Sequence, residues 1–266
     1  MGHVSAIANQ KGGVGKTTTA VSLAAALAIA ERPTLLVDLD AQCSSTKGLG
    51  LKAGPAGDMY GVLSGEVAMA DVLIPTELQY LSVAPASRDL VGAEIELVAA
   101  SGREFRLKEA LAPLRDRFDH ILIDCPPSLG LMTVNALSAA DGLIIPVQCE
   151  YLALEGVSQM VETLQRVQAA LNPGLVLDGV LLTMFDERTN LARQVVQEIR
   201  EYFKDRVYKS IVPRNVRLGE APSFGRPIML YDIRSRGAET YMNLAREVIR
   251  QNEKTSARER TQQPHP

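Results

Sequence analysis

One segment near the start of the chain constrains the fold more than any other. The glycine-rich run Lys11–Thr18 directly follows the apolar, strand-like stretch Val4–Ala8 and leads into an apolar helical stretch, Thr17–Ala30. A strand, a glycine-rich turn and a helix N-terminus in this order bind phosphate, because glycines let backbone amides turn toward it and the helix end adds partial positive charge. The segment therefore predicts a nucleotide-binding α/β protein.

The loop departs from the ordinary phosphate-loop pattern, G-x-x-x-x-G-K-[ST], at its first position, where Gln10 replaces glycine. The rest of the pattern fits. We expect Lys16 to reach the β- and γ-phosphates, the Thr17 hydroxyl to ligate Mg²⁺, and Thr18 to hold the α-phosphate of ATP. The predicted nucleotide-binding residues of the loop are Lys11, Gly12, Gly13, Val14, Gly15, Lys16, Thr17 and Thr18.

Three acidic residues follow apolar strand-like runs. The run Leu35–Asp40 ends in Asp38 and Asp40, which share one face because residues two apart on a strand point the same way. The run at 121–123 delivers Asp124, in the arrangement by which a carboxylate holds Mg²⁺. A single acid at a strand end more often caps a helix or turn. Three acids beside a phosphate loop instead favour a magnesium site.

Apolar runs and helical patterns alternate along the whole chain. Continuous apolar runs predict buried strands, and apolar residues at i, i+3 and i+4 predict helices. The predicted strands are Val4–Ala8, Thr34–Val37, Leu81–Ala84, His120–Ile123, Leu143–Val147, Leu177–Thr183 and Ser210–Val212. The predicted helices are Thr17–Ala30, Arg103–Arg117, Ala153–Leu171, Thr189–Phe203 and Gly237–Arg250. This alternation predicts an α/β fold with a doubly wound, mostly parallel sheet flanked by helices.

No repeat or domain boundary interrupts this pattern, so the chain is expected to form a single P-loop ATPase domain over residues 1–251. Residues 252–266 are polar and nearly devoid of apolar side chains. Such a segment cannot bury enough apolar surface to offset the entropy of ordering it. It is therefore predicted to be a disordered tail.

The composition excludes several classes of protein. The formal net charge is −3, so any contact with DNA must come from a local basic patch. Three cysteines, Cys43, Cys125 and Cys149, are odd in number and far apart, which argues against a disulfide framework and indicates a reducing, cytoplasmic compartment. No apolar stretch reaches the length of about 20 residues that spans a bilayer.

An additional lysine at the start of the loop, Lys11, indicates which class of phosphate-loop ATPase the chain resembles. The run KGGVGKTT is identical to the signature of the deviant Walker A ATPases, and further segments resemble the ParA/Soj partitioning proteins across residues 1–250. These segments are Gly92–Leu97, Asp124–Gly130, Pro146–Glu150, Pro213–Leu218 and Tyr231–Gly237. The resemblance implies an ATP-dependent homodimer in which Lys11 reaches the partner subunit's nucleotide. Longer members of the family carry an N-terminal helix-turn-helix domain. Ten residues before Lys11 are too few for such a domain, so we expect it to be absent here.

The resemblance also assigns roles to individual residues. Asp40 would position or activate the attacking water, with Lys11 and Lys16 as further catalytic residues, while Asp38 would support the magnesium shell beside Thr17 and Asp124. Met184, Pro213 and Asn215 would hold the adenine. The chain departs from the family at Ala41, where the family commonly has proline after Asp40. Because proline fixes φ, its loss is expected to loosen this loop and to change the rate of hydrolysis.

DNA binding without sequence preference is implied in the same way, with Arg188 and Arg217 as the contacts. From 183 to 236 the chain carries eleven Lys or Arg and seven Asp or Glu, a balance of +4 against −7 elsewhere. Arginines that neutralise phosphates give affinity for DNA without reading its sequence. The implied partners are double-stranded DNA and a ParB-type centromere-binding protein that stimulates hydrolysis, and the implied location is the nucleoid.

Three other functions share this loop. A MinD-like membrane ATPase would need a C-terminal amphipathic helix with exposed bulky apolar residues, and the residues after Asn252 have none. An iron–sulfur reductase would need cysteines at a symmetric dimer interface. A metabolic ATP-dependent ligase would need a dedicated substrate pocket, which the sequence does not reveal. We therefore expect a partitioning ATPase that does not bind membranes.

Overall fold

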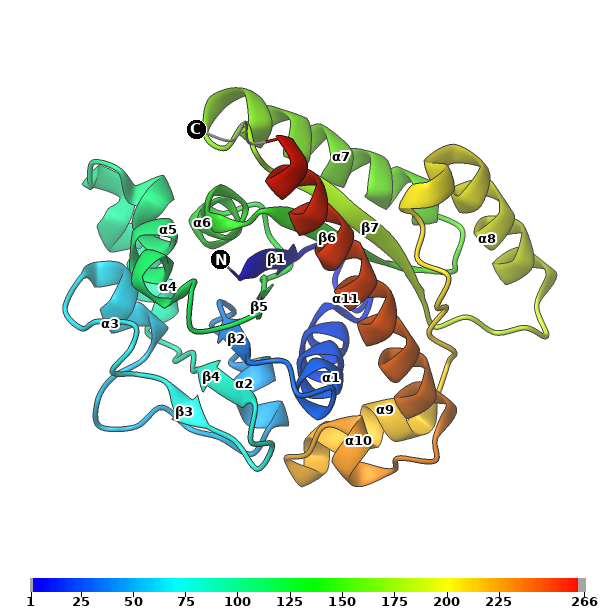
Figure 1. Ribbon diagram of the computed structural model, residues 1–266, viewed down its shortest axis with the longest axis horizontal. Helices are drawn as coiled ribbons and strands as arrows, with labels where there is room; N and C mark the ends of the chain where they lie inside the picture. The colour runs from blue at the N-terminus through cyan, green and yellow to red at the C-terminus, as the bar shows by residue number, and fades with distance from the viewer. Residues whose placement is uncertain (1, 263–266) are drawn as a thin grey trace.

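The computed structural model describes residues 2–262, which form a three-layered α/β fold around one seven-stranded sheet (Figure 1). The strands run in the spatial order β3-β4-β2-β5-β1-β6-β7, and all pairs are parallel except β3 with β4. They are β1 (His3–Ile7), β2 (Thr34–Asp38), β3 (Ile74–Pro75), β4 (Leu81–Ala84), β5 (His120–Asp124), β6 (Gly142–Gln148) and β7 (Val176–Thr183). The predicted doubly wound, mostly parallel sheet is confirmed.

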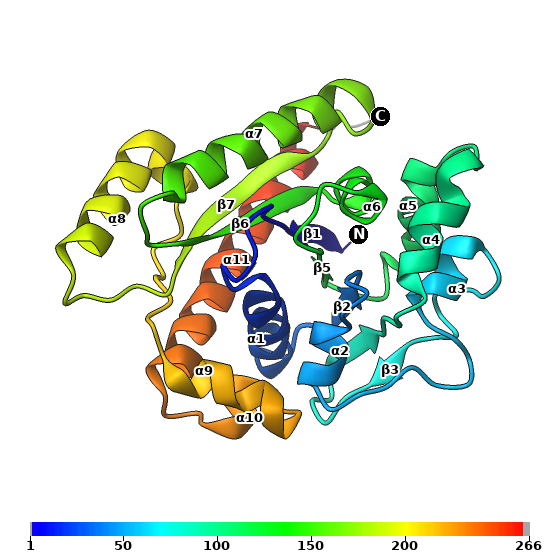
Figure 2. The same cartoon turned by 180° about the vertical axis from the view of Figure 1, so that it is seen from behind.

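Helices cover both faces of this sheet, as Figures 1 and 2 show from opposite sides. They are α1 (Lys16–Ile29), α2 (Ser44–Gly48), α3 (Met59–Ser64), α4 (Leu90–Glu96), α5 (Arg106–Leu111), α6 (Leu131–Ala139), α7 (Ala153–Ala170), α8 (Asn190–Phe203), α9 (Val216–Glu220), α10 (Ile228–Tyr231) and α11 (Arg236–Gln262). Helices α1, α9, α10 and α11 pack on one face, and α3 to α8 pack on the other. Each face has its own hydrophobic core.

Helix α1 is apolar nearly all round because it lies between the sheet and α11. Residues Ala20–Ala28 are all buried, so the alanines allow close approach on every side. Tyr241 of α11 is also buried, and its hydroxyl lies 3.1 Å from the Thr19 hydroxyl of α1. Helix α11 thus packs against the helix that begins at the phosphate loop.

Two local predictions were wrong, and one strand was missed. Ser210–Val212 is not a strand, because the Glu247 carboxylate accepts hydrogen bonds from the amides of Lys209 and Ser210 (2.7 and 2.8 Å) that strand pairing would need. The helix predicted over 103–117 is broken into α5 and two 3₁₀ turns, since Pro113 cannot continue an α-helix. The short antiparallel edge strand β3 was not predicted at all.

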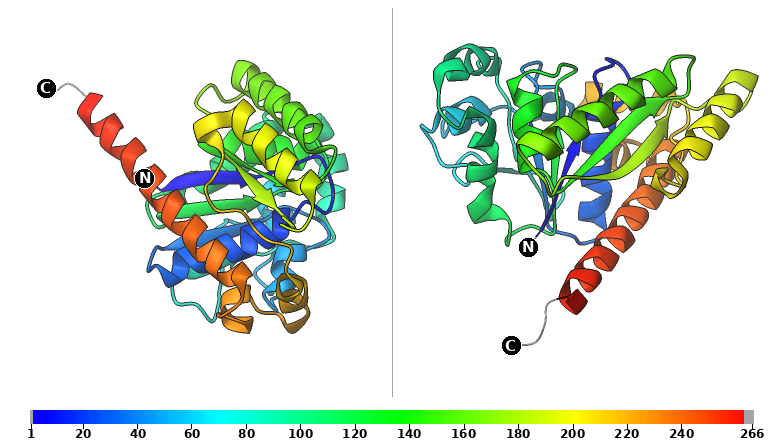
Figure 3. Two further views of the ribbon diagram at one scale, coloured as in Figure 1. Left: turned by 90° about the vertical axis from the view of Figure 1, so that its right-hand side faces the viewer. Right: turned by 90° about the horizontal axis from the view of Figure 1, so that it is seen from above.

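The C-terminal segment also differs from expectation. Residues 252–262, predicted to be disordered, continue α11, which extends past the sheet in Figure 3. This stretch contains neither glycine nor proline and is rich in Glu, Lys, Arg and Gln, all of which have high helix propensity. Residues 263–266 lie outside the described part of the chain. Within the described part, no helix is long and apolar enough to cross a bilayer.

Candidate nucleotide-binding site

The phosphate loop has the backbone that a phosphate cradle requires. Gly13 and Gly15 have φ values of 75° and 89°, in the left-handed region that glycine adopts without strain. Gly15 ends the loop immediately before α1, so the N-terminus of that helix points into the site. The buried ammonium group of Lys16 donates a hydrogen bond to the Lys11 carbonyl oxygen (3.1 Å).

Two side chains that the sequence did not single out fix this loop to the sheet. Asn9 donates to the Pro146 carbonyl oxygen (2.8 Å) and accepts from the Lys11 amide (3.0 Å). Thr183, at the end of β7, donates to the Val14 carbonyl oxygen (2.8 Å). Both are buried polar residues, and each donates to a carbonyl oxygen that is distant in sequence. The loop is therefore held from β6 and β7 as well as from its own strand.

Asp124 has the properties of a magnesium-binding carboxylate. Strand pairing places it beside Asp38, and it is fully buried. Its Oδ2 accepts a hydrogen bond from the Ser45 hydroxyl (2.7 Å), whereas its buried Oδ1 has no hydrogen-bond partner. A buried carboxylate oxygen without a donor is costly unless a cation satisfies it. The residues present therefore fit Mg²⁺, with Asp124 and the Thr17 hydroxyl as the groups to hold it.

Asp38 lies next to Asp124, but both of its carboxylate oxygens accept hydrogen bonds. Its Oδ2 accepts from the Thr46 amide (2.8 Å) and the Thr46 hydroxyl (2.7 Å), and its Oδ1 accepts from the Asp40 amide (3.1 Å). Asp38 thus organises the segment from Asp40 to α2, which we call the switch segment (residues 40–50). Asp38 would therefore support a magnesium shell by positioning the switch segment.

The charges of this site are unbalanced without a metal ion. Burial and, to a smaller extent, the neighbouring Asp38 carboxylate raise the pKa of Asp124 to about 7. Burial likewise raises the pKa of Asp38. Burial lowers the pKa of Lys16, although Asp124 and Asp40 oppose this effect. A divalent cation would offset the excess negative charge and favour ionised carboxylates, which is the electrostatic role of Mg²⁺ at such sites.

Asp40 lies at the start of the switch segment and is only half-buried. Its Oδ1 accepts from the Gln42 amide (2.9 Å), and its carbonyl oxygen accepts from the Cys43 amide (2.7 Å), which closes a tight turn. Cys43 has a φ of 56°, unusual for a residue with a side chain. The turn is thus defined by hydrogen bonds even though Ala41 replaces the expected proline.

The three residues predicted to hold the adenine line one cavity. This cavity, of about 260 Å³, adjoins the loop at Gly15 and Thr18 and includes Met184, Pro213 and Asn215. Asn215 also caps α9, since its Oδ1 accepts from the Arg217 amide (2.9 Å). The base-binding candidates and the start of α9 are therefore one structural unit.

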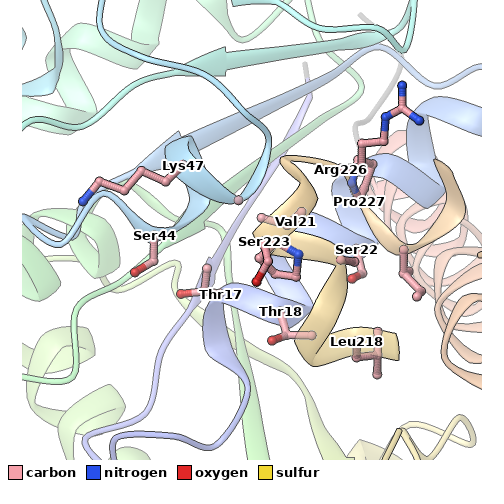
Figure 4. Close-up of a pocket in the computed structure, with 14 residues that line it drawn as sticks. Thr17, Thr18, Val21, Ser22, Ser44, Lys47, Leu218, Ser223, Arg226 and Pro227 are labelled. Carbon is pink, nitrogen blue, oxygen red and sulfur yellow. The ribbon is translucent and has the colours of Figure 1, made fainter. Parts of the chain in front are cut away.

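A second cavity, of about 360 Å³, lies on the other side of Thr18 and Leu218 (Figure 4). Residues of α1, of the switch helix α2 and of the turn after α9 line it. Hydroxyl groups and apolar side chains line it, while the charged ends of Lys47 and Arg226 point away from its centre. Part of the space between α1 and the switch helix is therefore not filled by side chains, although the two helices are in contact.

The two predicted DNA contacts lie on the surface and are paired with acids. Arg188 is 83% exposed and donates to both carboxylate oxygens of Asp186 (2.9 and 2.7 Å). Arg217 donates to Glu220 (3.0 Å) and lies 3.5 Å from Asp232. Exposed pairs of this kind contribute little to stability, so phosphate groups can compete for the guanidinium groups.

Comparisons with known proteins agree with this geometry. The family model described as an AAA domain matches residues 2–177. The "Chromosome partitioning protein ParA" of Myxococcus xanthus is 56% identical over 261 residues, covering 98% of this chain and 92% of that protein. The "Sporulation initiation inhibitor protein Soj" of Bacillus subtilis is 55% identical, covering 93% of this chain and 98% of that protein.

The chain belongs to the ParA/Soj family of partitioning ATPases. Among solved structures, a Mycobacterium smegmatis protein titled cobyrinic acid a,c-diamide synthase, with a bound ATP analogue and magnesium, is similar at a TM-score of 0.82 and 40% identity, covering 94% of this chain and 95% of that one. The MinD cell division ATPase of Pyrococcus furiosus is similar at 0.78 and 26%, covering 94% and 99%. This ParA/Soj protein is therefore an ATPase that uses ATP and Mg²⁺.

Proposed function

We propose that this ATPase is a nucleotide-switched DNA-binding dimer. ATP and Mg²⁺ drive two copies together, the dimer binds DNA without sequence preference, and hydrolysis releases it. A ParB-type centromere-binding protein stimulates hydrolysis, and the ATP-bound dimer resides on the nucleoid. The names of the relatives support partitioning, and the residues of this chain support the individual steps.

The observation that carries the proposal is the state of Lys11. Its main chain is fixed by Asn9 and Lys16, yet among the described residues no carboxylate pairs with its ammonium group. Lys11 begins the phosphate loop, where a second subunit could offer triphosphate oxygens. Lysine binds phosphate as a compact point charge, and bringing two triphosphates together requires such cations.

In the chemical step, the chain's own residues bind and orient the reactants. Backbone amides of residues 12–17 and the Lys16 ammonium group hold the phosphate oxygens at the helix N-terminus. When bound, Mg²⁺ neutralises charge that develops on the transferred phosphoryl group. Asp40, held by the turn at Gln42 and Cys43, orients the attacking water and accepts its proton. The Met184, Pro213 and Asn215 cavity holds the base.

DNA affinity would depend on pairing of subunits. A single subunit offers Arg188 and Arg217, which give weak binding because each must exchange a carboxylate for a phosphate. Two copies held together present two such surfaces, so the second contact becomes intramolecular and the apparent affinity rises. ATP thereby controls DNA binding without contacting DNA.

The test compares DNA binding with ATP, ADP and no nucleotide, using Lys11→Ala and a matched control, Lys108→Ala, on α5. We expect ATP alone to promote both dimerisation in light scattering and binding to a non-specific duplex. Lys11→Ala should lose both while Lys108→Ala keeps them. A Lys11→Ala protein that still dimerises and binds DNA with ATP would refute the proposal.

A metabolic ligase is a further candidate, because the M. smegmatis structure carries a synthase name at 40% identity. Relatives named for chromosome partitioning are more similar, at 49–56%. DNA stimulates the ATPase activity of a partitioning protein in the presence of its partner, whereas a ligase requires its own substrate. ATP-dependent DNA binding therefore separates the two.

A further inference from the structure

Two glycines from distant parts of the chain make a backbone contact that nothing above explains. Gly50 ends the switch segment, and Gly225 ends the 3₁₀ turn Ala221–Phe224 that follows α9. A Cβ atom added at Gly225 would lie 2.8 Å from the Gly50 Cα and 3.1 Å from its nitrogen. Both glycines have left-handed backbone, with φ values of 69° and 65°. Neither position can carry a side chain without a shift of the other segment.

On the switch side, hydrogen bonds connect this contact to the carboxylates. The Gly50 amide donates to the Lys47 carbonyl oxygen (2.9 Å), and the Leu51 amide donates to that of Thr46 (3.0 Å). Thr46 in turn holds Asp38 through its amide and its hydroxyl. Asp38 accepts from the amide of Asp40. Hydrogen bonds through Thr46 and Asp38 therefore connect the backbone near Gly50 to Asp40.

On the other side, the contact connects to the base cavity and to Arg217. The Gly225 amide donates to the Pro222 carbonyl oxygen (3.1 Å), and the turn continues directly from α9. Helix α9 begins at Asn215, which lines the base cavity, and contains Arg217. The contact is thus the point where the hydrolytic and the base-binding segments meet.

The second cavity makes this contact important. Figure 4 shows the residues that line it, and this cavity leaves part of the switch helix without packing against α1, although the two helices are in contact. A Cβ at Gly48 would make only ordinary contact with Pro222, at 3.7 Å. The close backbone approach of Gly50 to Gly225 is the tightest restraint that the glycine positions show between these two segments.

We propose that the contact between Gly50 and Gly225 is a positioning contact for ATP hydrolysis, which sets the switch segment, and with it Asp40, relative to the base-binding segment. This inference rests on the proposed role of Asp40. A change of about 1 Å in a catalytic group can reduce turnover by up to about a hundredfold. A shift of several tenths of an ångström should give a smaller but measurable loss.

The test uses Gly225→Ala with Gly102→Ala as a matched control. Gly102 has a φ of 67°, nearly that of Gly225, but a Cβ there would meet nothing within 4 Å. The control therefore carries the same backbone strain without the contact. We expect Gly225→Ala to lower kcat about tenfold while KM and ADP affinity change less than about twofold. Gly102→Ala should match the parent in all three.

Equal kcat values for the two variants would overturn the proposal, as would a parallel loss of ADP affinity in Gly225→Ala. If Gly225→Ala does not fold, Gly50→Ala replaces it, because its Cβ would meet the Gly225 carbonyl oxygen at the milder distance of 3.1 Å. A kcat unchanged from Gly102→Ala then refutes the inference. Asp40→Ala distinguishes a failure of the proposed function from a failure of this inference. Normal turnover in Asp40→Ala refutes the proposed role of Asp40. Slow turnover in Asp40→Ala together with normal turnover in Gly225→Ala refutes only the positioning contact.

Discussion

Thr46 holds the switch segment, and its hydroxyl gives a direct measure of that role. The hydroxyl donates to Asp38 Oδ2 (2.7 Å) and accepts from the Ala86 amide (3.1 Å), and the residue is 2% exposed. Thr46→Val keeps the shape and removes both hydrogen bonds. It leaves a buried carboxylate oxygen with one donor fewer and a buried N–H group without an acceptor.

The expected cost follows from these two losses. A hydrogen bond to a charged group contributes about 1.5–3 kcal/mol, and a buried unsatisfied amide costs about 1–3 kcal/mol. The two losses share one site and are not fully additive, so Thr46→Val should reduce the free energy of unfolding by about 2–5 kcal/mol. Thr46→Ser retains the hydroxyl and loses one methyl group, for a cost of about 1 kcal/mol.

Urea unfolding at pH 7.5, followed by circular dichroism, measures both variants. The midpoint of Thr46→Val should fall well below that of Thr46→Ser with an unchanged m-value. ATP turnover should also fall further in Thr46→Val, because Asp38 then holds the switch segment only through backbone amides. If Val is no more destabilising than Ser, the hydroxyl does not hold Asp38 and the reasoning fails.

Two further predictions concern surface charge and pH. Glu220→Gln removes a carboxylate that accepts a hydrogen bond from Arg217 (3.0 Å) and would compete with DNA phosphates for it. ATP-dependent DNA affinity should therefore rise about two- to fivefold at low salt in a fluorescence anisotropy titration. Weaker binding would contradict the assignment of Arg217. Burial lowers the pKa of His120 from 6.5 to about 4, so the folded state favours the neutral ring and its stabilising effect is lost as pH falls from about 6.5 to about 4. Between these two pH values the free energy of unfolding should fall by about 2–3 kcal/mol less in His120→Gln than in the parent, as measured by urea midpoints. Equal pH dependence of the two proteins would refute this.

The sequence predicted the loop, the acids and most of the sheet because each is encoded locally. A glycine-rich run between a strand and a helix, or an acid after an apolar run, is visible without knowing the fold. The roles of Asn9, Thr46 and Thr183 were not predictable, since each depends on a partner that only the tertiary structure brings close. Gly50 and Gly225 were likewise indistinguishable from ordinary turn glycines until their backbones were seen in contact.

The structure also refined what the acids do. Asp38 and Asp124 both follow strands and both looked like magnesium ligands. Their oxygen atoms separate them, because those of Asp38 accept three hydrogen bonds from the switch segment while one oxygen of Asp124 accepts none. The number of donors around each oxygen is set by the tertiary structure.

The packing of α11 over α1 has a consequence for biosynthesis. During translation the buried residues of α1, including Leu23 and Leu27, emerge early, yet residues of α11 in the same hydrophobic core, such as Tyr241 and Leu244, are made much later. The nascent chain must therefore carry an incompletely covered apolar helix next to its phosphate loop until α11 has been synthesised. A ribosome that stops before α11 would release a polypeptide with exposed apolar surface that is prone to aggregation.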